Sequence, residues 1–285
     1  MSVASLRESG ILNVNYPEDL RGAVSTAVES WRKFCQLPKE EKCLFNFVLD
    51  EIDGAGYELK EEKGAKKDLK ENFHVTLYQH PRLTKIAGEA SLQFLNNAQQ
   101  LLDKIEPLVL QVAAQMEHEF NLAGVVQGAQ EGKSRWTLRY LHYFGDQEKG
   151  KEIALPHTDK GVMTLHLYES DTGLEYYDLK ERTWKTMPIA EQGTVIITAA
   201  QLQFLSQGSL QALYHRVVAT EKTAQVGRYS MVCFIPFQNT PLYNKSSYGA
   251  MQTHLVGYNY GMPHPEYAKF FVTKDEAVRK VEPQA

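Results

Sequence analysis

The chain has 285 residues, of which 43% are hydrophobic and 23% charged, and its formal net charge is −4. This composition predicts a folded chain with a sizeable core and excludes wholesale disorder, while the absence of a basic stretch interleaved with aromatics argues against a nucleic-acid partner. No apolar run approaches the roughly 20 residues of a membrane span, and residues 1–10 lack an apolar signal core, so we expect no membrane association and a cytoplasmic protein.

The first half of the chain has mainly helical periodicity. Apolar residues recur at helical spacing over residues 17–37, with Pro17 suited to a first turn and Pro38 as the stop. Residues 54–72 are rich in glycine and charge and are predicted to form a surface loop. A longer helical pattern covers residues 83–121, and we expect a break inside it because globular helices rarely run that long.

The second half changes character after about residue 134. Short runs rich in Thr, Tyr, Val, Ile and Phe are separated by turn-prone residues, at 136–144, 161–169, 174–179, 193–199, 215–220 and 228–237. Many short strands at regular spacing are typical of a sandwich or a closed barrel. We therefore divide the chain into an N-terminal helical region, 1–133, and a β core with C-terminal loops and a helix, 134–285. The aromatic segments 236–249 and 257–267 are expected to be loops, either closing over a substrate or without a role.

The three cysteines, Cys35, Cys43 and Cys233, cannot all pair within one chain, and none forms a CxxC motif. They are predicted to be reduced thiols in a reducing compartment.

Three polar features in the β-rich half indicate metal and anion chemistry. His157-Thr158-Asp159 places an imidazole and a carboxylate on one side of an extended chain. His215 follows 58 residues later at the start of a predicted strand, and two histidines with one carboxylate form the set that binds Fe(II) while leaving open positions. Arg228 and Ser230 share a strand face and suit one end of a dicarboxylate. Each feature alone is common, and a lone strand histidine is more often structural.

The three features occur in a fixed order, with HxD first, then His215 at the start of a strand, then Arg228 and Ser230 entering the next strand. With this order, the chain resembles the isopenicillin N synthase-like family of Fe(II)/2-oxoglutarate-dependent dioxygenases. The resemblance is carried by LPHTDKGVMTLHLYESDTGLEYYDLKERTW, ALYHRVVA and GRYSMVCFIPF, with weaker matches in FCQLPKEEK, GYELK and DLKENFHV. It extends over most of the chain and implies a double-stranded β-helix, or jelly roll, with helices packed outside. We expect the chain to start after a strand and helix with which the family usually opens.

The resemblance also implies roles for single residues. His157, Asp159 and His215 match the iron ligands, and Arg228 with Ser230 matches the pair that binds the distal carboxylate of 2-oxoglutarate. Tyr143 matches a tyrosine that also reaches this cosubstrate, and Phe234 matches a position near the substrate. The chain departs from the usual family pattern at two places in the expected cosubstrate pocket. Leu141 occupies a position where the family usually has asparagine, and Thr198-Ala199-Ala200-Gln201 occupies the place of Asn-x-Gly-Asp.

The implied reaction uses O2 to decarboxylate 2-oxoglutarate to succinate and CO2 while hydroxylating or desaturating a small metabolite. His166 alternates with Thr164 and Tyr168, so it is expected either to face the barrel and touch substrate or to be structural. Two alternatives remain open: an iron oxidase of the same fold that does not use 2-oxoglutarate, and a jelly-roll binding protein without catalysis. The sequence does not identify the substrate or the oligomeric state.

Overall fold

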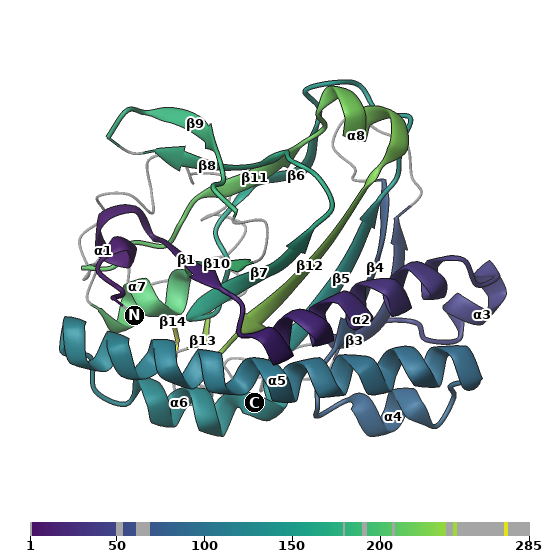
Figure 1. Ribbon diagram of the computed structural model, residues 1–285, viewed down its shortest axis with the longest axis horizontal. Coiled ribbons are helices and arrows are strands. Elements are labelled where there is room, and N and C mark those ends of the chain that lie inside the picture. The colour runs from purple at the N-terminus through teal and green to yellow at the C-terminus, as the bar shows by residue number, and fades with distance from the viewer. Residues whose placement is uncertain are drawn as a thin grey trace, which may run out of the picture.

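An eight-stranded antiparallel sheet forms the larger layer of the protein (Figure 1). The computed structural model describes residues 2–49, 54–60, 69–178, 180–189, 193–206, 209–237, 242–243 and 271–272. In sheet order, the strands of the larger layer are β1 (Ile11–Asn15), β10 (Gly193–Thr198), β7 (Met163–Glu169), β12 (Arg228–Ile235), β5 (Thr137–Tyr143), β4 (Lys70–Val75), β3 (Gly54–Lys60) and β2 (Val48–Leu49).

A four-stranded antiparallel sheet forms the second layer, in the order β6 (Glu152–His157), β11 (His215–Val218), β8 (Leu174–Asp178) and β9 (Thr183–Thr186). Apolar side chains from both sheets share one buried cluster, including Leu141, Val195 and Val232 from the large sheet and Leu174 and Val217 from the small one. The two sheets therefore pack face to face, which confirms the predicted jelly roll. Two further short strands, β13 (Leu242–Tyr243) and β14 (Phe271–Val272), pair with each other.

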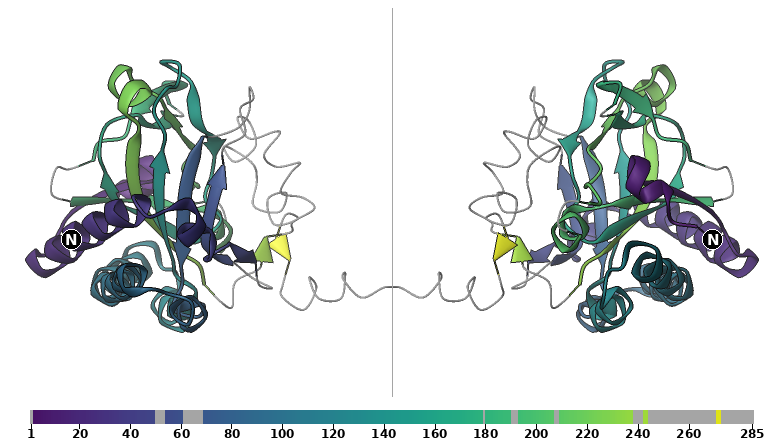
Figure 2. Two further views of the ribbon diagram at one scale, coloured as in Figure 1. Left: turned by 90° about the vertical axis from the view of Figure 1, so that its right-hand side faces the viewer. Right: turned by 90° about the vertical axis from the view of Figure 1, so that its left-hand side faces the viewer.

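Helices cover the outer side of the large sheet (Figures 1 and 2). The longest two, α2 (Glu18–Cys35) and α5 (Glu89–Phe120), run alongside each other. The others are α1 (Ser5–Ser9), α3 (Lys39–Cys43), α4 (His80–Thr84), α6 (Val125–Gly132), α7 (Ala200–Leu205), α8 (Glu221–Val226) and one 3-10 turn (Lys133–Arg135). In the part of the chain that the structure describes, no helix combines the length and apolar character needed to cross a bilayer.

An aromatic cluster joins these helices to the sheet. Trp31 and Phe34 of α2 meet Phe94 of α5 with ring centroids 5.8 and 4.9 Å away, and Phe94 meets Tyr140 of β5 at 4.9 Å. Trp31 Nε1 also donates a hydrogen bond to the carbonyl of Leu141 at 3.3 Å. This packing fixes one face of β5, so its opposite face is available to line the space between the sheets.

The six strands predicted after residue 134 are all present, as β5, β7, β8, β10, β11 and β12, and the helix predicted at 17–37 is α2. Two predictions for the first half need correction. Residues 54–72 are not simply a loop, because β3 and β4 extend the large sheet, and Tyr57 and Phe73 are buried against Phe34. The strands were not predicted because glycine and charged residues in this stretch are typical of a surface loop. Gly56, with φ 121°, lies so close to the Phe45 carbonyl that a Cβ would clash.

The break predicted inside the helical pattern of residues 83–121 is present at residues 85–88. Downstream of this break, α5 continues for 32 residues through Pro107, since its apolar stripe stays buried on both sides of that proline. An opening strand is present as well: β1 pairs with β10 at the edge of the large sheet, contrary to the expectation that the chain starts after one. Most of the segments 236–249 and 257–267 lie outside the described residues.

Candidate metal centre

His157, Asp159 and His215 come together at the edge of the small sheet. His157 ends β6 and His215 begins β11, and the two residues are direct partners in the antiparallel register. Asp159 follows two residues after the end of β6. One ligand atom from each of the three side chains lies within 4.8 Å of the others. Strand pairing thus brings together residues that are 58 positions apart in the sequence.

Hydrogen bonds orient both imidazoles toward the carboxylate. His157 Nδ1 lies 2.7 Å from the Leu155 carbonyl and His215 Nδ1 lies 3.2 Å from the Leu213 carbonyl. Because a carbonyl only accepts, each Nδ1 carries the hydrogen and each Nε2 keeps a free lone pair. These Nε2 atoms lie 3.7 and 3.9 Å from the two oxygens of Asp159.

The carboxylate of Asp159 is buried and held by a neighbouring strand. Its side chain is 6% exposed, and Thr164 Oγ1 of β7 donates to Oδ2 at 2.6 Å. Burial by itself raises the pKa of Asp159, but His215, His157 and the Thr164 bond outweigh it, so the pKa lies below its usual value. His215 lowers the pKa of Asp159 only when its imidazole is protonated, and burial disfavours that form because desolvation lowers the pKa of His215. The hydrogen bond from Thr164 lowers the pKa of Asp159 whether or not the histidine is protonated.

This donor set fits a divalent transition metal such as Fe(II). It consists of two neutral imidazoles and one carboxylate, with both ligating nitrogens fixed by backbone carbonyls. Both histidines lie beside Asp159. Three protein donors leave coordination positions open for other molecules.

Arg228 and Tyr143 lie opposite each other on β12 and β5, and Ser230 follows Arg228 on the same face. All three residues are buried, with Arg228 only 1% exposed. Tyr143 belongs to the apolar cluster between the sheets, so this face is the interior one. The structure therefore brings the three residues expected to hold 2-oxoglutarate to one end of the barrel.

Arg228 has an acidic partner that the sequence did not predict. Between Thr223 and Tyr267 the sequence contains no acid except Glu266, which predicts that the Arg228 guanidinium needs an external anion. This expectation is wrong, because Glu169 of the adjacent strand β7 places Oε2 2.5 Å from Arg228 Nη2. Arg228 Nε also donates to the Asp171 carbonyl at 3.3 Å.

Glu169 faces the interior because β7 contains a bulge. Along the pairing with β12, Val232 opposes His166 but Met231 opposes Tyr168, so Leu167 is an extra residue. The predicted alternation of His166 with Tyr168 is therefore wrong beyond Leu167. Tyr168 packs on the helical side, where its hydroxyl accepts a hydrogen bond from Arg32 at 3.1 Å, and Glu169 takes the inward place.

His166 and Phe234 are both close to the interior near the metal centre. His166 is 5% exposed, and its ring lies perpendicular to that of His215 at a centroid distance of 5.9 Å. Its Nδ1 lies 3.0 Å from Glu169 Oε1, whereas Nε2 has no hydrogen-bond partner among the described residues. Phe234 packs at the margin of the inner cluster, with the Arg139 guanidinium 4.8 Å above its ring.

Comparison with known proteins shows which proteins the chain is similar to. Residues 133–236, which contain all three candidate ligands and Arg228, match the 2OG-Fe(II) oxygenase superfamily. The jasmonate-induced oxygenase 2 of Arabidopsis thaliana is 24% identical over 244 residues, which are 77% of this chain and 63% of that protein.

Other known proteins show similarity over a shorter stretch or in structure. The 2-oxoglutarate-dependent dioxygenase citB of Monascus ruber is 31% identical over 102 residues, 34% of this chain and 30% of its own. The structure of the dioxygenase for auxin oxidation 1 from Arabidopsis thaliana, in complex with 2-oxoglutarate, has a TM-score of 0.64 at 18% identity, covering 82% of this chain and 87% of that one. The chain spans less than two thirds of the two curated relatives.

Superfamily motifs could not reveal every inward-facing residue. Thr164, Glu169 and Arg139 were missed as site residues. Strand alternation from Tyr143 would have suggested Arg139, because residues 139, 141 and 143 share one face of β5. No sequence signal identifies Glu169, since the bulge reverses the alternation.

A second group of metal-binding residue types lies on the helical side of the large sheet, outside the superfamily site. Cys35, Glu71 and His142 bring ligand atoms within 4.8 Å of one another. However, the Glu71 carboxylate already accepts from Lys42 at 2.7 Å, Tyr57 at 2.7 Å and His142 at 2.8 Å. A metal would have to displace the lysine, so the group is a structural hydrogen-bond network.

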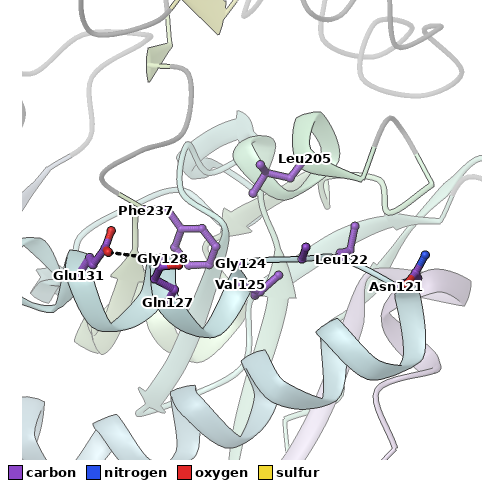
Figure 3. A pocket seen from close by; sticks show the side chains of 10 residues that line it. Asn121, Leu122, Gly124, Val125, Gln127, Gly128, Glu131, Leu205 and Phe237 are labelled. Carbon is purple, nitrogen blue, oxygen red and sulfur yellow. Dashed lines mark hydrogen bonds between the residues drawn. The ribbon is translucent and has the colours of Figure 1, made fainter.

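A hollow of about 360 Å³ lies away from both groups, between α6 and α7 (Figure 3). Its lining includes Leu122, Val125, Leu205 and Phe237, with Glu131 at one margin accepting from Gln127 at 2.7 Å. None of the candidate metal ligands lines this hollow.

Proposed function

We propose that this protein is a non-haem Fe(II) oxygenase that uses 2-oxoglutarate and O2 to hydroxylate or desaturate a small metabolite. The observation that carries the proposal is the convergence of His157, Asp159 and His215 with both Nε2 atoms directed at the carboxylate. The match of residues 133–236 to the 2OG-Fe(II) oxygenase superfamily supports the same chemistry.

In this proposal, His157, Asp159 and His215 hold Fe(II). The metal together with 2-oxoglutarate supplies the oxidising power, with release of succinate and CO2. Thr164 keeps the Asp159 carboxylate in position, and the two backbone carbonyls keep the imidazoles in the ligating tautomer. The protein itself therefore contributes orientation rather than a redox group.

The inner face of the large sheet is proposed to receive the organic molecules. Arg228, Ser230 and Tyr143 lie together at one end and would take the distal carboxylate of 2-oxoglutarate. His166 and Phe234 are proposed to contact the substrate, and the apolar cluster between the sheets would exclude water from the reaction. A small molecule suits this enclosed, mixed polar and aromatic lining better than a protein segment.

A same-fold iron oxidase that does not use 2-oxoglutarate is the second candidate. The contact between Arg228 and Glu169 favours it, since the guanidinium already has an anion beside it. We retain 2-oxoglutarate as the leading proposal, because the superfamily match includes the Arg228-Tyr229-Ser230 segment.

We also propose a cytoplasmic location, which the three free cysteines, Cys35, Cys43 and Cys233, support. Fractionation of the source cells tests this proposal directly. Recovery of the protein in an oxidising compartment would contradict it.

The decisive experiment on the activity compares wild type with Asp159→Ala. The variant should lose stoichiometric Fe(II) in metal analysis and lose succinate release, because the metal loses its charged ligand. Asp19→Ala, which removes an exposed carboxylate of α2, is the control and should retain both properties. Full metal content and turnover in Asp159→Ala would refute the site. Metal binding and substrate oxidation without succinate release in wild type would favour the oxidase.

A further inference from the structure

The barrel end that contains Arg228 also contains an anion of its own. The side chains of Arg228 and Glu169 are 1% and 4% exposed, and their charged atoms approach to 2.5 Å. A buried guanidinium needs a negative partner, and here the chain provides that partner before any ligand binds.

Glu169 connects this end of the barrel to the metal centre. One of its oxygens contacts Arg228, and the other lies 3.0 Å from Nδ1 of His166. The His166 ring in turn meets His215 at a centroid distance of 5.9 Å. The line from His215 through His166 and Glu169 to Arg228 therefore runs through the space that a cosubstrate joining the metal to Arg228 would use.

The charges along this line oppose a second carboxylate. Arg228 and Glu169 together carry no net charge. If a dicarboxylate binds at Arg228, its distal carboxylate and the Glu169 carboxylate share one guanidinium. Two like charges within about 4–5 Å in a buried site repel strongly, because the effective dielectric there is near 20 and far below that of water. Glu169 must therefore weaken the grip of Arg228 on an incoming anion.

Glu169 does not serve mainly to aim the guanidinium. Arg228 is already enclosed and is held through Nε by the Asp171 carbonyl. Moreover, neither Glu169 Oε2 nor Arg228 Nη2 has a partner with hydrogen-bond geometry among the residues described. The contact between the two side chains is therefore a charge interaction and not a bidentate hydrogen-bonded salt bridge.

We propose that Glu169 is the residue that sets cosubstrate specificity, by competing with the distal carboxylate of 2-oxoglutarate for Arg228. The inference rests on the proposed function, because it assumes that Arg228 receives this carboxylate. Glu169 makes the site discriminate less strongly in favour of 2-oxoglutarate over a 2-oxo acid that lacks the second carboxylate.

The test measures binding rather than turnover, with Mn(II) in place of Fe(II). Dissociation constants of 2-oxoglutarate and of 2-oxopentanoate, which has the same chain length without the distal carboxylate, are determined by calorimetry for wild type and Glu169→Gln. We expect Glu169→Gln to bind 2-oxoglutarate at least about tenfold more tightly, since a neutral amide removes the repulsion. Binding of 2-oxopentanoate should stay within about twofold.

Glu175→Gln is the matched control, because Glu175 also pairs with an arginine, Arg216 at 2.8 Å, but on the small sheet. It should leave both constants unchanged. If Glu169→Gln does not fold, Glu169→Asp is used instead; it withdraws the carboxylate by one methylene and should tighten 2-oxoglutarate binding in the same direction.

The outcomes separate this inference from the proposed function. Wild type that binds 2-oxoglutarate while Glu169→Gln binds it equally or more weakly would overturn the role of Glu169 and leave the function intact. Equal tightening for both 2-oxo acids would also overturn it, because the effect would not depend on the distal carboxylate. No binding of 2-oxoglutarate by either protein would overturn both proposals together.

Discussion

The hydroxyl of Thr164 is a small group with a large expected effect on the metal centre. It donates to Asp159 Oδ2 at 2.6 Å, and loss of such a supporting bond typically costs a metal site about 10–100-fold in affinity. Thr164→Val should therefore weaken Fe(II) or Mn(II) binding by this factor, as measured by metal titration. Thr194→Val removes a buried hydroxyl that donates to the His166 carbonyl at 3.0 Å and is the control.

Equal losses of metal affinity in Thr164→Val and Thr194→Val would contradict a specific role for the Thr164 bond. They would indicate a general disturbance of the barrel instead. A loss confined to Thr164→Val, with similar thermal stability in both variants, is the expected result.

Arg228 illustrates why a residue found by motif still needs its structural neighbours. Arg228→Ala would remove the proposed cosubstrate contact, but it would also leave Glu169 buried without a cation. Breaking a buried pair in this way destabilises a fold by about 3–5 kcal/mol. A raised KM for 2-oxoglutarate in Arg228→Ala therefore cannot be assigned to cosubstrate binding alone, and substitutions of Glu169 separate the two effects.

At the scale of single residues, the convergence of the three candidate ligands was predictable, because HxD and a later strand histidine are signals with a defined spacing in the sequence. Strand pairing of His157 with His215 then brings them together. Glu169 was not predictable, because its inward position depends on one extra residue in β7. Thr164 was visible as an inward-facing position, but its bond to Asp159 depends on the turn after β6.

Among the elements, β4 is anchored to α3 and to the neighbouring strands β3 and β5 through Glu71. Its carboxylate is 3% exposed and accepts hydrogen bonds from Lys42, Tyr57 and His142. Burial opposes ionisation, but the bonds from these three residues prevail and lower the pKa of Glu71 to about 2. The ionised carboxylate thus holds α3 to the sheet and joins β4 to β3 and β5.

The pH dependence of stability should reflect this anchor. A carboxyl whose pKa is lower in the folded state stabilises the protein above its unfolded pKa, and this contribution disappears as the pH falls through the folded value. From the ordinary value of 4.5 to about 2, the difference corresponds to about 3 kcal/mol. Glu71→Gln should therefore lose less stability than wild type between about pH 5 and pH 2.

The measurement is the free energy of unfolding in urea at a series of pH values. Glu29→Gln, which replaces an exposed acid of α2, is the control and should follow wild type. Parallel curves for wild type and Glu71→Gln across this range would show that Glu71 is not the titrating anchor.

Element prediction succeeded where side-chain periodicity is strong and failed where the backbone decides. The strands after residue 134 have dense β-branched and aromatic runs, and all six were found. In β3, Gly54 and Gly56 are required by close contacts with Phe47 and the Phe45 carbonyl, so residues that suggest a loop in the sequence belong to a strand. The length of α5 follows from packing on both sides of Pro107, which propensity alone does not predict.

Considered as a whole, the molecule is a jelly roll whose candidate metal centre depends on both sheets. The small sheet provides His157 and His215, and the large sheet provides Thr164, which holds Asp159. A metal bound there should therefore stabilise the folded state as a unit. A ligand at 100 times its dissociation constant adds about 2.7 kcal/mol of stability.

Saturating Mn(II) should accordingly raise the Tm of wild type by about 5 °C or more, given the usual relation between stability and Tm for chains of this size. Differential scanning calorimetry with and without Mn(II) measures the shift, and a chelator should reverse it. Asp159→Ala should show no shift. A similar rise in Asp159→Ala would mean that Mn(II) stabilises the protein at another site.

The overall architecture was predictable because many short, regularly spaced strands have few ways to bury their apolar faces. The extent of the large sheet was not, since β1, β3 and β4 come from the first 75 residues and join it through long-range pairing. Such pairing depends on contacts between distant segments, which local periodicity cannot report.

The extra residue at Leu167 also matters for anyone who aligns or redesigns this strand. Counting every second residue from Thr164 would select Tyr168, whose hydroxyl meets Arg32 on the helical side, and would omit Glu169. A variant library aimed at the interior should therefore randomise positions 164, 166 and 169. Deleting one residue at the bulge would exchange the directions of the side chains that follow it, and a relative shorter by one residue here would present a different chemical group to the same space.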